Sequence, residues 1–338
     1  MSATHLKSIQ SHARITAIGT YVPSRILSNA DLEQLVDTSD EWIVQRTGIR
    51  ERRIAAPDEF TSDIIFAAVR NMLDRFPVTL SDVDYIIVAT STPDTFFPSM
   101  AARVQGEFKI GSCGTVDISA ACAGFTAGIQ LGNSLLLTGL YRKVLVIGAD
   151  AISKITDYTD RTTCILFGDG AGAIIMENTG NEKGCLLAAY SHTDGASGHH
   201  VYRSSLSSSI NQFDIVTNGM LVQNGKEVYR WAVTQVSKGI QRILQDYGFS
   251  AEDIDWFVPH SANMRIVEAI QQRTGIAPEK TLTSMEYYGN TSAASIPLAI
   301  DEAFKKGHVQ PNQKLLLYGF GGGLTEAAVI IRWELTEP

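Results

Sequence analysis

Two parts of the sequence repeat each other, and this duplication limits the possible folds more than any other feature. SDVDYIIVATS resembles EDIDWFVPHS, which pairs Tyr85 with Trp256 at an offset of 171 residues (256 − 85). KVLVIGA begins at Lys143 and KLLLYGF at Lys314, and this second pair has the same offset. Two separate matches at one offset are hard to obtain by chance. We therefore predict a duplicated fold with a boundary near residues 178–184, where ENTGNEKG is typical of a loop.

Each half alternates strand-like and helix-like segments, which is typical of an α/β fold. Most strand-like runs are continuously apolar, as expected for sheets that are covered on both faces. The strand candidates are RITAIG, DYIIVAT, TVDIS, KVLVIGA, GAIIME, CLLAAY, DWFVPH, KTLTSM, KLLLYG and AAVIIRW. The helix candidates include SDIIFAAVRNMLDRF and VYRWAVTQVSKGIQRILQDYG. The repeat is too long for a solenoid, so we predict two fused α/β halves, residues 1–180 and 181–338.

The duplication also predicts where a functional site forms. Ligand sites of open α/β sheets lie beyond the carboxyl ends of the strands, and two related halves would bring such ends into one cleft. Cys122 follows the strand-like run TVDIS, and His260 ends DWFVPH. Asn290 follows KTLTSMEYYG, and the glycine-rich loop 319–323 overlaps the end of KLLLYG.

The nucleophile candidate of this cleft is Cys122, in DISAACAGF. Its small neighbours let a substrate approach, and a helix beginning near it would favour the thiolate. Each candidate also has a structural interpretation. A free cysteine is often a small buried hydrophobe, and His260 could be a hydrogen-bonded core histidine. Asn290 could be a turn residue, and residues 319–323 could be only a flexible loop.

Composition argues against several classes of protein. The formal net charge of −8 disfavours nucleic-acid binding and binding to anionic membranes. The four cysteines form no CxxC pair and have no histidine at zinc-ligand spacing, so we expect no metal site. No apolar run approaches the ~18 residues of a membrane span, and the N-terminus lacks the apolar segment of a signal peptide. We expect a cytoplasmic protein with reduced thiols.

Four segments together resemble β-ketoacyl-acyl carrier protein synthase III, the condensing enzyme that initiates bacterial fatty acid synthesis. They are DISAACAGF, VPHSANMRI, YGNTSAASIP and GFGGGLT, and their order and spacing fit this family. The resemblance runs from RITAIGTYVP to the C-terminus, and it includes DTSDEWIVQRTGIRERRIA and TDRTTCILFGDGAGA. It implies a thiolase-like five-layered αβαβα sandwich, usually a homodimer.

The resemblance implies a reaction in two steps. An acyl group passes from coenzyme A to Cys122, and malonyl-acyl carrier protein then loses carbon dioxide to give an enolate that attacks the acyl-cysteine. Neutral His260 and the Asn290 amide would donate hydrogen bonds to the thioester oxygen on which negative charge collects. The backbone amides of Cys122 and Gly322 would form a separate oxyanion hole for the acyl-enzyme. The coenzyme A thioester is a substrate in this scheme, and no cofactor is permanently bound.

The resemblance also assigns residues that would hold coenzyme A. Thr38 and Glu41 have the spacing of a capping box at a helix start, and this places Trp42 and Arg46 on one helix face. In the family, the matching residues hold the adenine by stacking, and Arg161 matches a further nucleotide-contacting arginine. From the residues alone, Trp42 could equally pack on the core and Arg46 could be a solvated charge.

Two further residues match partner-binding positions of the family. Arg265 corresponds to a basic residue that contacts the acidic carrier protein, and Phe97 to a phenylalanine that crosses the dimer to close the partner's acyl pocket. Without the resemblance, they are an ordinary surface arginine and a core aromatic. Ser261 stands where many members have glutamine, and Glu326 where many have tryptophan. Because neither change removes a catalytic group, they put the substrate preference in doubt more than the reaction.

Several related activities fit the sequence less well. A thiolase needs a second catalytic cysteine near the C-terminal glycine loop, and elongating condensing enzymes have a second histidine where this chain has Asn290. Plant-type polyketide synthases share the Cys-His-Asn set but are usually longer. A non-catalytic protein that binds acyl carriers or coenzyme A would need none of the three residues. The primer, acetyl or branched acyl, cannot be identified from the sequence.

Overall fold

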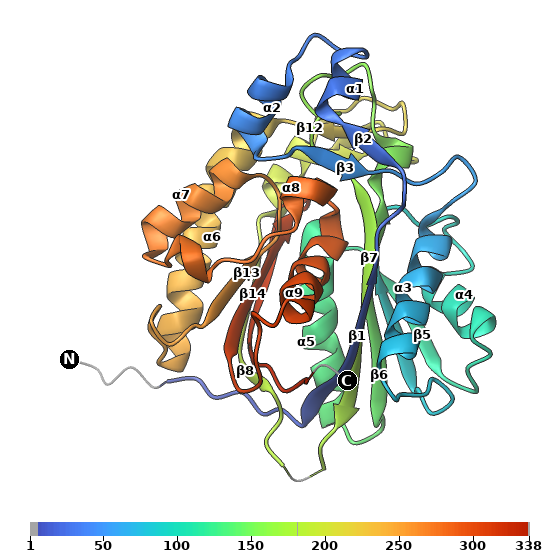
Figure 1. The fold of residues 1–338 in the computed structure, drawn as a ribbon, viewed down its shortest axis with the longest axis vertical. Helices are drawn as coiled ribbons and strands as arrows, with labels where there is room; N and C mark the ends of the chain where they lie inside the picture. Colours follow the sequence, from blue (N-terminus) through green and yellow to red (C-terminus); the bar gives the residue numbers. More distant parts are fainter. Residues whose placement is uncertain (1–5, 181, 337–338) are drawn as a thin grey trace.

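The computed structural model describes residues 6–180 and 182–336, and two β-sheets form its framework (Figure 1). The first sheet has the strand order β1-β7-β6-β4-β5, in which β4 pairs in parallel with β5 and β6, and β7 is antiparallel to β1 and β6. The bounds of its strands are β1 (Ala13–Tyr21), β4 (Tyr85–Ala89), β5 (Gly114–Ile118), β6 (Lys143–Ala151) and β7 (Asp169–Asn178).

The second sheet repeats this arrangement with the order β13-β14-β15-β8. Its strands are β8 (Leu186–Thr193), β13 (Trp256–Pro259), β14 (Lys314–Gly321) and β15 (Thr325–Arg332). The register of the two sheets agrees with the sequence duplication. Tyr85 lies opposite Val144 in the first sheet, and Trp256 lies opposite Leu315 in the second, so both residues of the pair are displaced by 171 positions.

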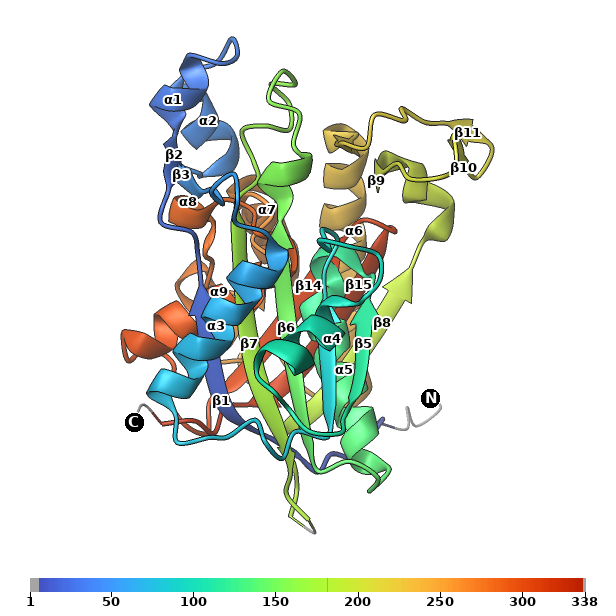
Figure 2. The same ribbon diagram turned by 90° about the vertical axis from the view of Figure 1, so that its right-hand side faces the viewer.

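Helices cover both sheets and separate them (Figures 1 and 2). Helices α5 and α9 lie between the sheets, α3 and α4 cover the outer face of the first sheet, and α6 and α7 cover the outer face of the second. Their bounds are α3 (Thr61–Arg75), α4 (Met100–Glu107), α5 (Gly124–Leu137), α6 (Gly225–Tyr247), α7 (Met264–Thr274) and α9 (Ser295–Lys305). This layering confirms the predicted αβαβα sandwich. Over the described residues, none of the helices combines the length and apolar character that crossing a membrane requires.

Shorter elements surround one end of the sandwich, beyond the carboxyl ends of the central parallel strands (Figure 2). The short strands are β2 (Ile26–Ser28), β3 (Glu51–Arg53), β9 (Val201–Arg203), β10 (Ser209–Ile210), β11 (Phe213–Asp214) and β12 (Leu221–Gln223). The short helices are α1 (Asn29–Glu33), α2 (Asp40–Thr47) and α8 (Met285–Tyr288). The 3-10 turns there are η1 (Ala121–Ala123), η2 (Ile152–Ile155), η3 (Gly195–His200) and η5 (Ser292–Ala294). A further turn, η4 (Pro278–Lys280), lies at the other end, beside the segment that precedes β13.

Two details of the sequence prediction are wrong. KTLTSM does not form a strand, because only Thr281 pairs with the second sheet, through a single bridge to Phe257. Thr38 does not cap α2. Ser39 does, because its side chain accepts the backbone N–H of Trp42 at 3.2 Å.

The η1 and η5 turns are equivalent, and each packs against the sheet of the other half. Both begin with a non-glycine residue at positive φ, +43° at Ala121 and +51° at Ser292, and these residues are 171 positions apart. A Cβ atom on Gly319 would lie 2.7 Å from the Cα of Ala123, and one on Gly148 would lie 2.6 Å from the carbonyl oxygen of Ala293. Only glycine permits these two close contacts, which hold the halves together.

Candidate active site

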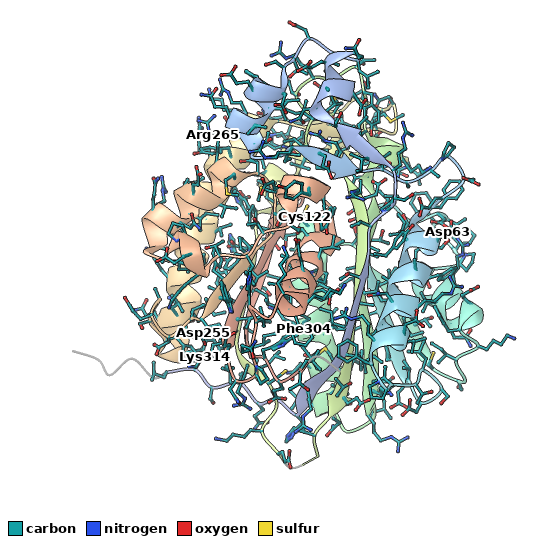
Figure 3. The ribbon with its side chains drawn as sticks, in the orientation of Figure 1. Asp63, Cys122, Asp255, Arg265, Phe304 and Lys314 are labelled. Carbon is teal, nitrogen blue, oxygen red and sulfur yellow. The ribbon has the colours of Figure 1, made fainter. Side chains whose placement is uncertain are left out.

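A cavity of about 580 Å³ lies between the halves, beyond the carboxyl ends of the central strands. Both halves supply its walls, and the four predicted site residues Cys122, His260, Asn290 and Gly322 are among them. Figure 3 shows Cys122 near the middle of the molecule, where the halves meet. Most of the remaining lining is apolar and includes Ile152, Leu166, Val201, Leu221, Ile266 and Phe320. This is the cleft that the duplication predicts.

Cys122 occupies the centre of the η1 turn and is partly exposed to the cavity. A Cβ atom on Gly321 would lie 3.0 Å from its Sγ atom, so the end of β14 closely approaches the thiol. Burial raises the pKa of the thiol to about 12, and the charge of Asp150 acts in the same direction, whereas the Ser292 side chain and the Cys122 backbone amide oppose the effect. The helix beginning at Gly124 is where the sequence predicts it, but burial shifts the pKa of the thiol in the direction opposite to the lowering expected from the helix.

His260 follows β13 and is buried, with 2 % of its surface exposed. Burial lowers the pKa of its imidazole to about 3, so the ring is neutral at physiological pH, as predicted. The Nδ1 atom lies 2.8 Å from the Oγ atom of Ser295, and the ring edge contacts Phe320 at 5.3 Å between centroids. Ser295 therefore engages Nδ1, and a hydrogen bond between the ring and the Ser292 backbone opposes the effect of burial on the pKa.

Asn290 lies between α8 and η5, and its backbone pairs with the first half. Its N–H donates to the Leu166 carbonyl at 2.8 Å, and its own carbonyl accepts the Gly168 N–H at 3.1 Å. The side-chain Oδ1 atom accepts the Ser292 N–H at 2.9 Å. Since Oδ1 is occupied, the orientation of the amide is fixed, and its Nδ2 atom is left as the free hydrogen-bond donor.

Gly322 belongs to the loop that joins β14 to β15 and lines the cavity beside η1. A Cβ atom placed on it would make only ordinary contacts, at 3.4 Å from Val201 and 3.5 Å from Ala121. The loop is therefore close to Cys122, and the proposed oxyanion pair of the Cys122 and Gly322 amides stays a prediction.

The residues predicted to hold coenzyme A form one cluster at the rim. The Cζ atom of Arg46 lies 5.7 Å from the Trp42 ring centroid, and that of Arg161 lies 5.1 Å from it. Arg161 also forms an exposed ion pair with Asp37 at 3.4 Å. Trp42 packs against a hydrophobic cluster that contains the cavity-lining residue Phe167. The cluster adjoins the cavity, but its three predicted residues are not part of the cavity wall.

The two predicted partner-binding residues are exposed. Arg265 lies on the first turn of α7, at the outer surface of the molecule (Figure 3). Phe97 is 87 % exposed and does not line the cavity of its own chain, whereas the neighbouring Phe96 does. An isolated chain therefore leaves the Phe97 ring without an apolar environment.

Three residues near the site were not singled out from the sequence as site residues. Ser295 contacts the His260 ring, and Ser292 donates to Asn290. Asp150, at the end of β6, is fully buried beside both turns. The equivalence of the two turns is the sequence feature that could have identified the serines, and a single acid after the apolar run KVLVIGA could have identified Asp150.

The two departures from the family pattern are buried polar residues. Ser261 accepts the Ser284 N–H at 3.0 Å, and its own N–H donates to the Ser295 hydroxyl at 3.3 Å. Glu326 accepts the Tyr318 hydroxyl at 2.9 Å and the Tyr190 hydroxyl at 3.3 Å, and burial raises the pKa of its carboxyl. Ser261 thus contacts Ser295, the partner of His260, while Glu326 forms a separate cluster beneath α6.

In the described part of the chain, no group of three or more His, Cys, Asp and Glu residues could hold a metal ion.

In comparisons with known proteins, nearly the whole chain matches proteins of one kind. The family model "3-Oxoacyl-[acyl-carrier-protein (ACP)] synthase III" matches residues 116–195, and its C-terminal counterpart matches residues 244–333. The chain is 54% identical to "Beta-ketoacyl-[acyl-carrier-protein] synthase III 2" of Bacillus subtilis (strain 168) over 325 residues, which cover 96% of this chain and 100% of the relative. It is 52% identical to the protein of the same name from Bacillus anthracis over 328 residues, 97% of this chain and 100% of the relative. A solved β-ketoacyl-[acyl carrier protein] synthase III from Thermus thermophilus superposes with a TM-score of 0.90 at 42% identity, covering 95% of this chain and 99% of that one.

Proposed function

The chain belongs to the 3-oxoacyl-[acyl-carrier-protein] synthase III family, and we propose that Cys122, His260 and Asn290 carry out its reaction. It is an acyltransferase that condenses an acyl-CoA with malonyl-acyl carrier protein and so initiates fatty acid synthesis. The observation that supports the residue roles is the convergence of all three side chains on one cavity between the halves.

Cys122 is the acyl acceptor in this proposal. A thioester suits the reaction because its carbonyl stays reactive toward a carbon nucleophile. The sulfur attacks the acyl-CoA carbonyl, the bond to the coenzyme A sulfur breaks, and the proton of the Cys122 thiol finally resides on coenzyme A. The amides of Cys122 and Gly322 stabilise the oxyanion of this step.

His260 and Asn290 act in the second step. When malonyl-acyl carrier protein loses carbon dioxide, negative charge collects on its thioester oxygen. We infer that the Ser295 hydroxyl, which accepts the Ser261 N–H, donates to Nδ1 of His260, so that the imidazole proton resides on Nε2. The Nε2–H group and the Nδ2–H group of Asn290 then donate to that oxygen. The enolate carbon attacks the acyl-cysteine carbonyl, the bond from that carbonyl to the Cys122 sulfur breaks, and the released thiolate takes a proton from solvent. No base is needed because decarboxylation itself generates the carbanion.

The substrates occupy the two rims of the cavity. Trp42, Arg46 and Arg161 hold the coenzyme A nucleotide, whose planar adenine and anionic phosphates suit an aromatic ring with two guanidinium groups beside it. The exposed Arg265 attracts the acidic carrier protein toward an otherwise acidic chain. We further propose a homodimer in which the exposed Phe97 enters the partner's acyl pocket, and the two halves 1–180 and 181–338 as its building units.

Mass spectrometry of the protein after incubation with acetyl-CoA or isobutyryl-CoA tests the proposal. We expect an acyl adduct on the peptide that contains Cys122, and the stronger adduct identifies the preferred primer. Cys113→Ala is the matched control, because Cys113 is also partly exposed but lies outside the cavity. It should retain the adduct, whereas an adduct on another cysteine, or none with any acyl-CoA, would refute the acyl-enzyme role.

A further inference from the structure

Arg52 is a fully buried cation near the reaction centre, and the roles proposed above make no use of it. It lies in β3, and its exposed surface is 0 %. Among the described residues, its hydrogen-bond acceptors are neutral oxygen atoms, no carboxylate forms an ion pair with it, and its Nε atom has no partner. Burying a charge without a counter-ion costs free energy, so Arg52 contributes through the positions that its hydrogen bonds fix.

One amino group of the guanidinium holds the segment against which Asn290 is aligned. The Nη2 atom donates to the Ile165 carbonyl oxygen at 2.5 Å. The residues that follow pair with Asn290, because the Leu166 carbonyl accepts its N–H at 2.8 Å and the Gly168 N–H donates to its carbonyl at 3.1 Å. Arg52 thus fixes the segment that sets the backbone position of Asn290.

The aliphatic part of Arg52 packs against both strands of this pairing. A Cβ atom on Gly168 would lie 3.2 Å from the Arg52 Cβ atom, and one on Gly289 would lie 3.0 Å from it. Gly289 directly precedes Asn290 in the chain. β3 accordingly lies against α8, which ends two residues before Asn290 (Figure 1). The stem of the arginine and its guanidinium therefore constrain the same loop.

The other amino group ties this loop to the lobe that carries α2. The Nη1 atom donates to Oδ1 of Asn29 at 2.7 Å. Asn29 is itself fixed, because its Nδ2 atom donates to Oδ1 of Asp40 at 2.7 Å and to the Ile49 carbonyl at 2.9 Å. Asp40 is the first residue of α2, the helix of the predicted coenzyme A cluster. A rigid, planar guanidinium therefore joins the coenzyme A rim to the loop of Asn290.

We propose that Arg52 is a positioning residue of the condensation: it anchors the loop of Asn290 to the α2 lobe and so holds the Asn290 amide at the thioester oxygen of malonyl-acyl carrier protein. The inference rests on the proposed role of Asn290 as a donor to that oxygen. Arg52 does not line the cavity, so it acts through Asn290 and touches no substrate. Its hydrogen bonds do not reach the η1 turn of Cys122, so the acylation step does not depend on it.

A double-mutant cycle of Arg52→Met and Asn290→Ala tests this proposal. Release of carbon dioxide from malonyl-acyl carrier protein should fall by about tenfold in Arg52→Met, because the amide is displaced. It should fall by about 100- to 1000-fold in Asn290→Ala, because the amide is lost. The double variant should match Asn290→Ala within about twofold, since Arg52 acts through a group that is already absent. A general packing defect would instead make the two losses multiply.

Acylation of Cys122 at saturating acetyl-CoA is the second measurement, and it should stay close to the wild-type rate in Arg52→Met. Lys143→Met is the matched control, because Lys143 is another buried cation and lies at the start of β6, outside the cavity wall. Its partners are Asp82 at 2.9 Å and Glu177 at 3.1 Å. Both partial reactions of this variant should match those of the wild type.

Multiplying losses in the double variant, wild-type carbon dioxide release in Arg52→Met, an equal loss in both partial reactions, or the same selective loss in Lys143→Met would overturn the proposal. If Arg52→Met does not fold, Arg52→Lys enters the same cycle, because its single nitrogen keeps the charge but cannot span both acceptors. Failure of both Arg52 variants to fold would also overturn the proposal. If Asn290→Ala itself releases carbon dioxide at the wild-type rate, the proposed function fails instead, so the two failures are distinguishable.

Discussion

The η1 turn of the first half and the η5 turn of the second half share a backbone and differ in their side chains. Both start at positive φ, and both are followed by a helix that lies between the sheets. Cys122 stands at the centre of η1, and Ala293 occupies the equivalent position of η5. The shared backbone is therefore the scaffold of the duplicated unit, and the thiol is an addition to one copy.

At the positions beside the two turns, it is the second half that carries the polar side chains. In the second half, Ser295 contacts the His260 ring. The equivalent pair in the first half is Gly124 and Ala89, and a Cβ atom on Gly124 would lie 2.7 Å from the Ala89 Cβ atom. In the proposed function, one half carries the acyl acceptor and the other the donors, so neither sheet has to accommodate a complete reaction centre. Substitutions that make one copy resemble the other test this division.

The largest effect is expected for Cys122→Ala, which gives the first turn the residue of the second. Condensation should fall by at least ~1000-fold, because the acyl acceptor is lost. The acyl adduct should also disappear from the mass spectrum, while the melting temperature stays close to that of the wild type, since alanine already occupies the equivalent position of η5. Turnover comparable to that of the wild type would refute the role of the thiol.

His260→Ala, which copies Ala89 into the second half, should reduce the decarboxylation of malonyl-acyl carrier protein by about 100- to 1000-fold, the usual loss for one oxyanion donor. Acylation of Cys122 should survive, because its oxyanion hole consists of backbone amides. The two partial reactions are measured separately, with release of carbon dioxide for one and adduct formation for the other. Selective loss of acylation would contradict the division between the halves.

A smaller effect, about tenfold on decarboxylation, is expected for Ser295→Ala, which removes a single hydrogen bond from the His260 ring. Without this hydroxyl the proton is no longer confined to Nε2, so a fraction of the rings presents an acceptor to the thioester oxygen. Acylation is the internal control, and an equal loss in both partial reactions would indicate a general packing defect instead.

The smallest effect concerns stability in acid. Burial lowers the pKa of His260 to about 3 in the folded protein, whereas an unfolded histidine has a pKa near 6.5. Between these values the unfolded chain binds more protons, so the histidine makes stability fall as pH decreases from about 6.5 toward 3, by up to about 1.4 kcal/mol per pH unit. His260→Ala lacks this contribution. Urea unfolding between pH 6.5 and 4.5 should show a flatter dependence for the variant, and parallel curves would contradict the prediction.

The sequence predicts the two fused α/β halves well because the duplication is visible in strands whose residues are almost entirely apolar, and the family resemblance implies that the halves form a sandwich. It also predicts the convergence of Cys122, His260 and Asn290, since each follows a strand or loop at the same edge. It does not predict that burial raises the pKa of the Cys122 thiol, because the burial of Sγ depends on how closely Gly321 approaches from the other half. Asp150 is missed for a similar reason, since the Ala293 N–H that its Oδ2 atom faces lies 143 positions away in the chain.

The contacts of Gly319 with η1 and of Gly148 with η5 have a consequence for fragments of the chain. Each turn rests on a strand that belongs to the other half, so a fragment that contains only one half lacks the support of its own turn. Two separately produced fragments would become active only after they bind each other, and their activity would then depend on concentration as a second-order process. The reaction centre is in this sense a property of the assembled pair, even though a single polypeptide encodes it.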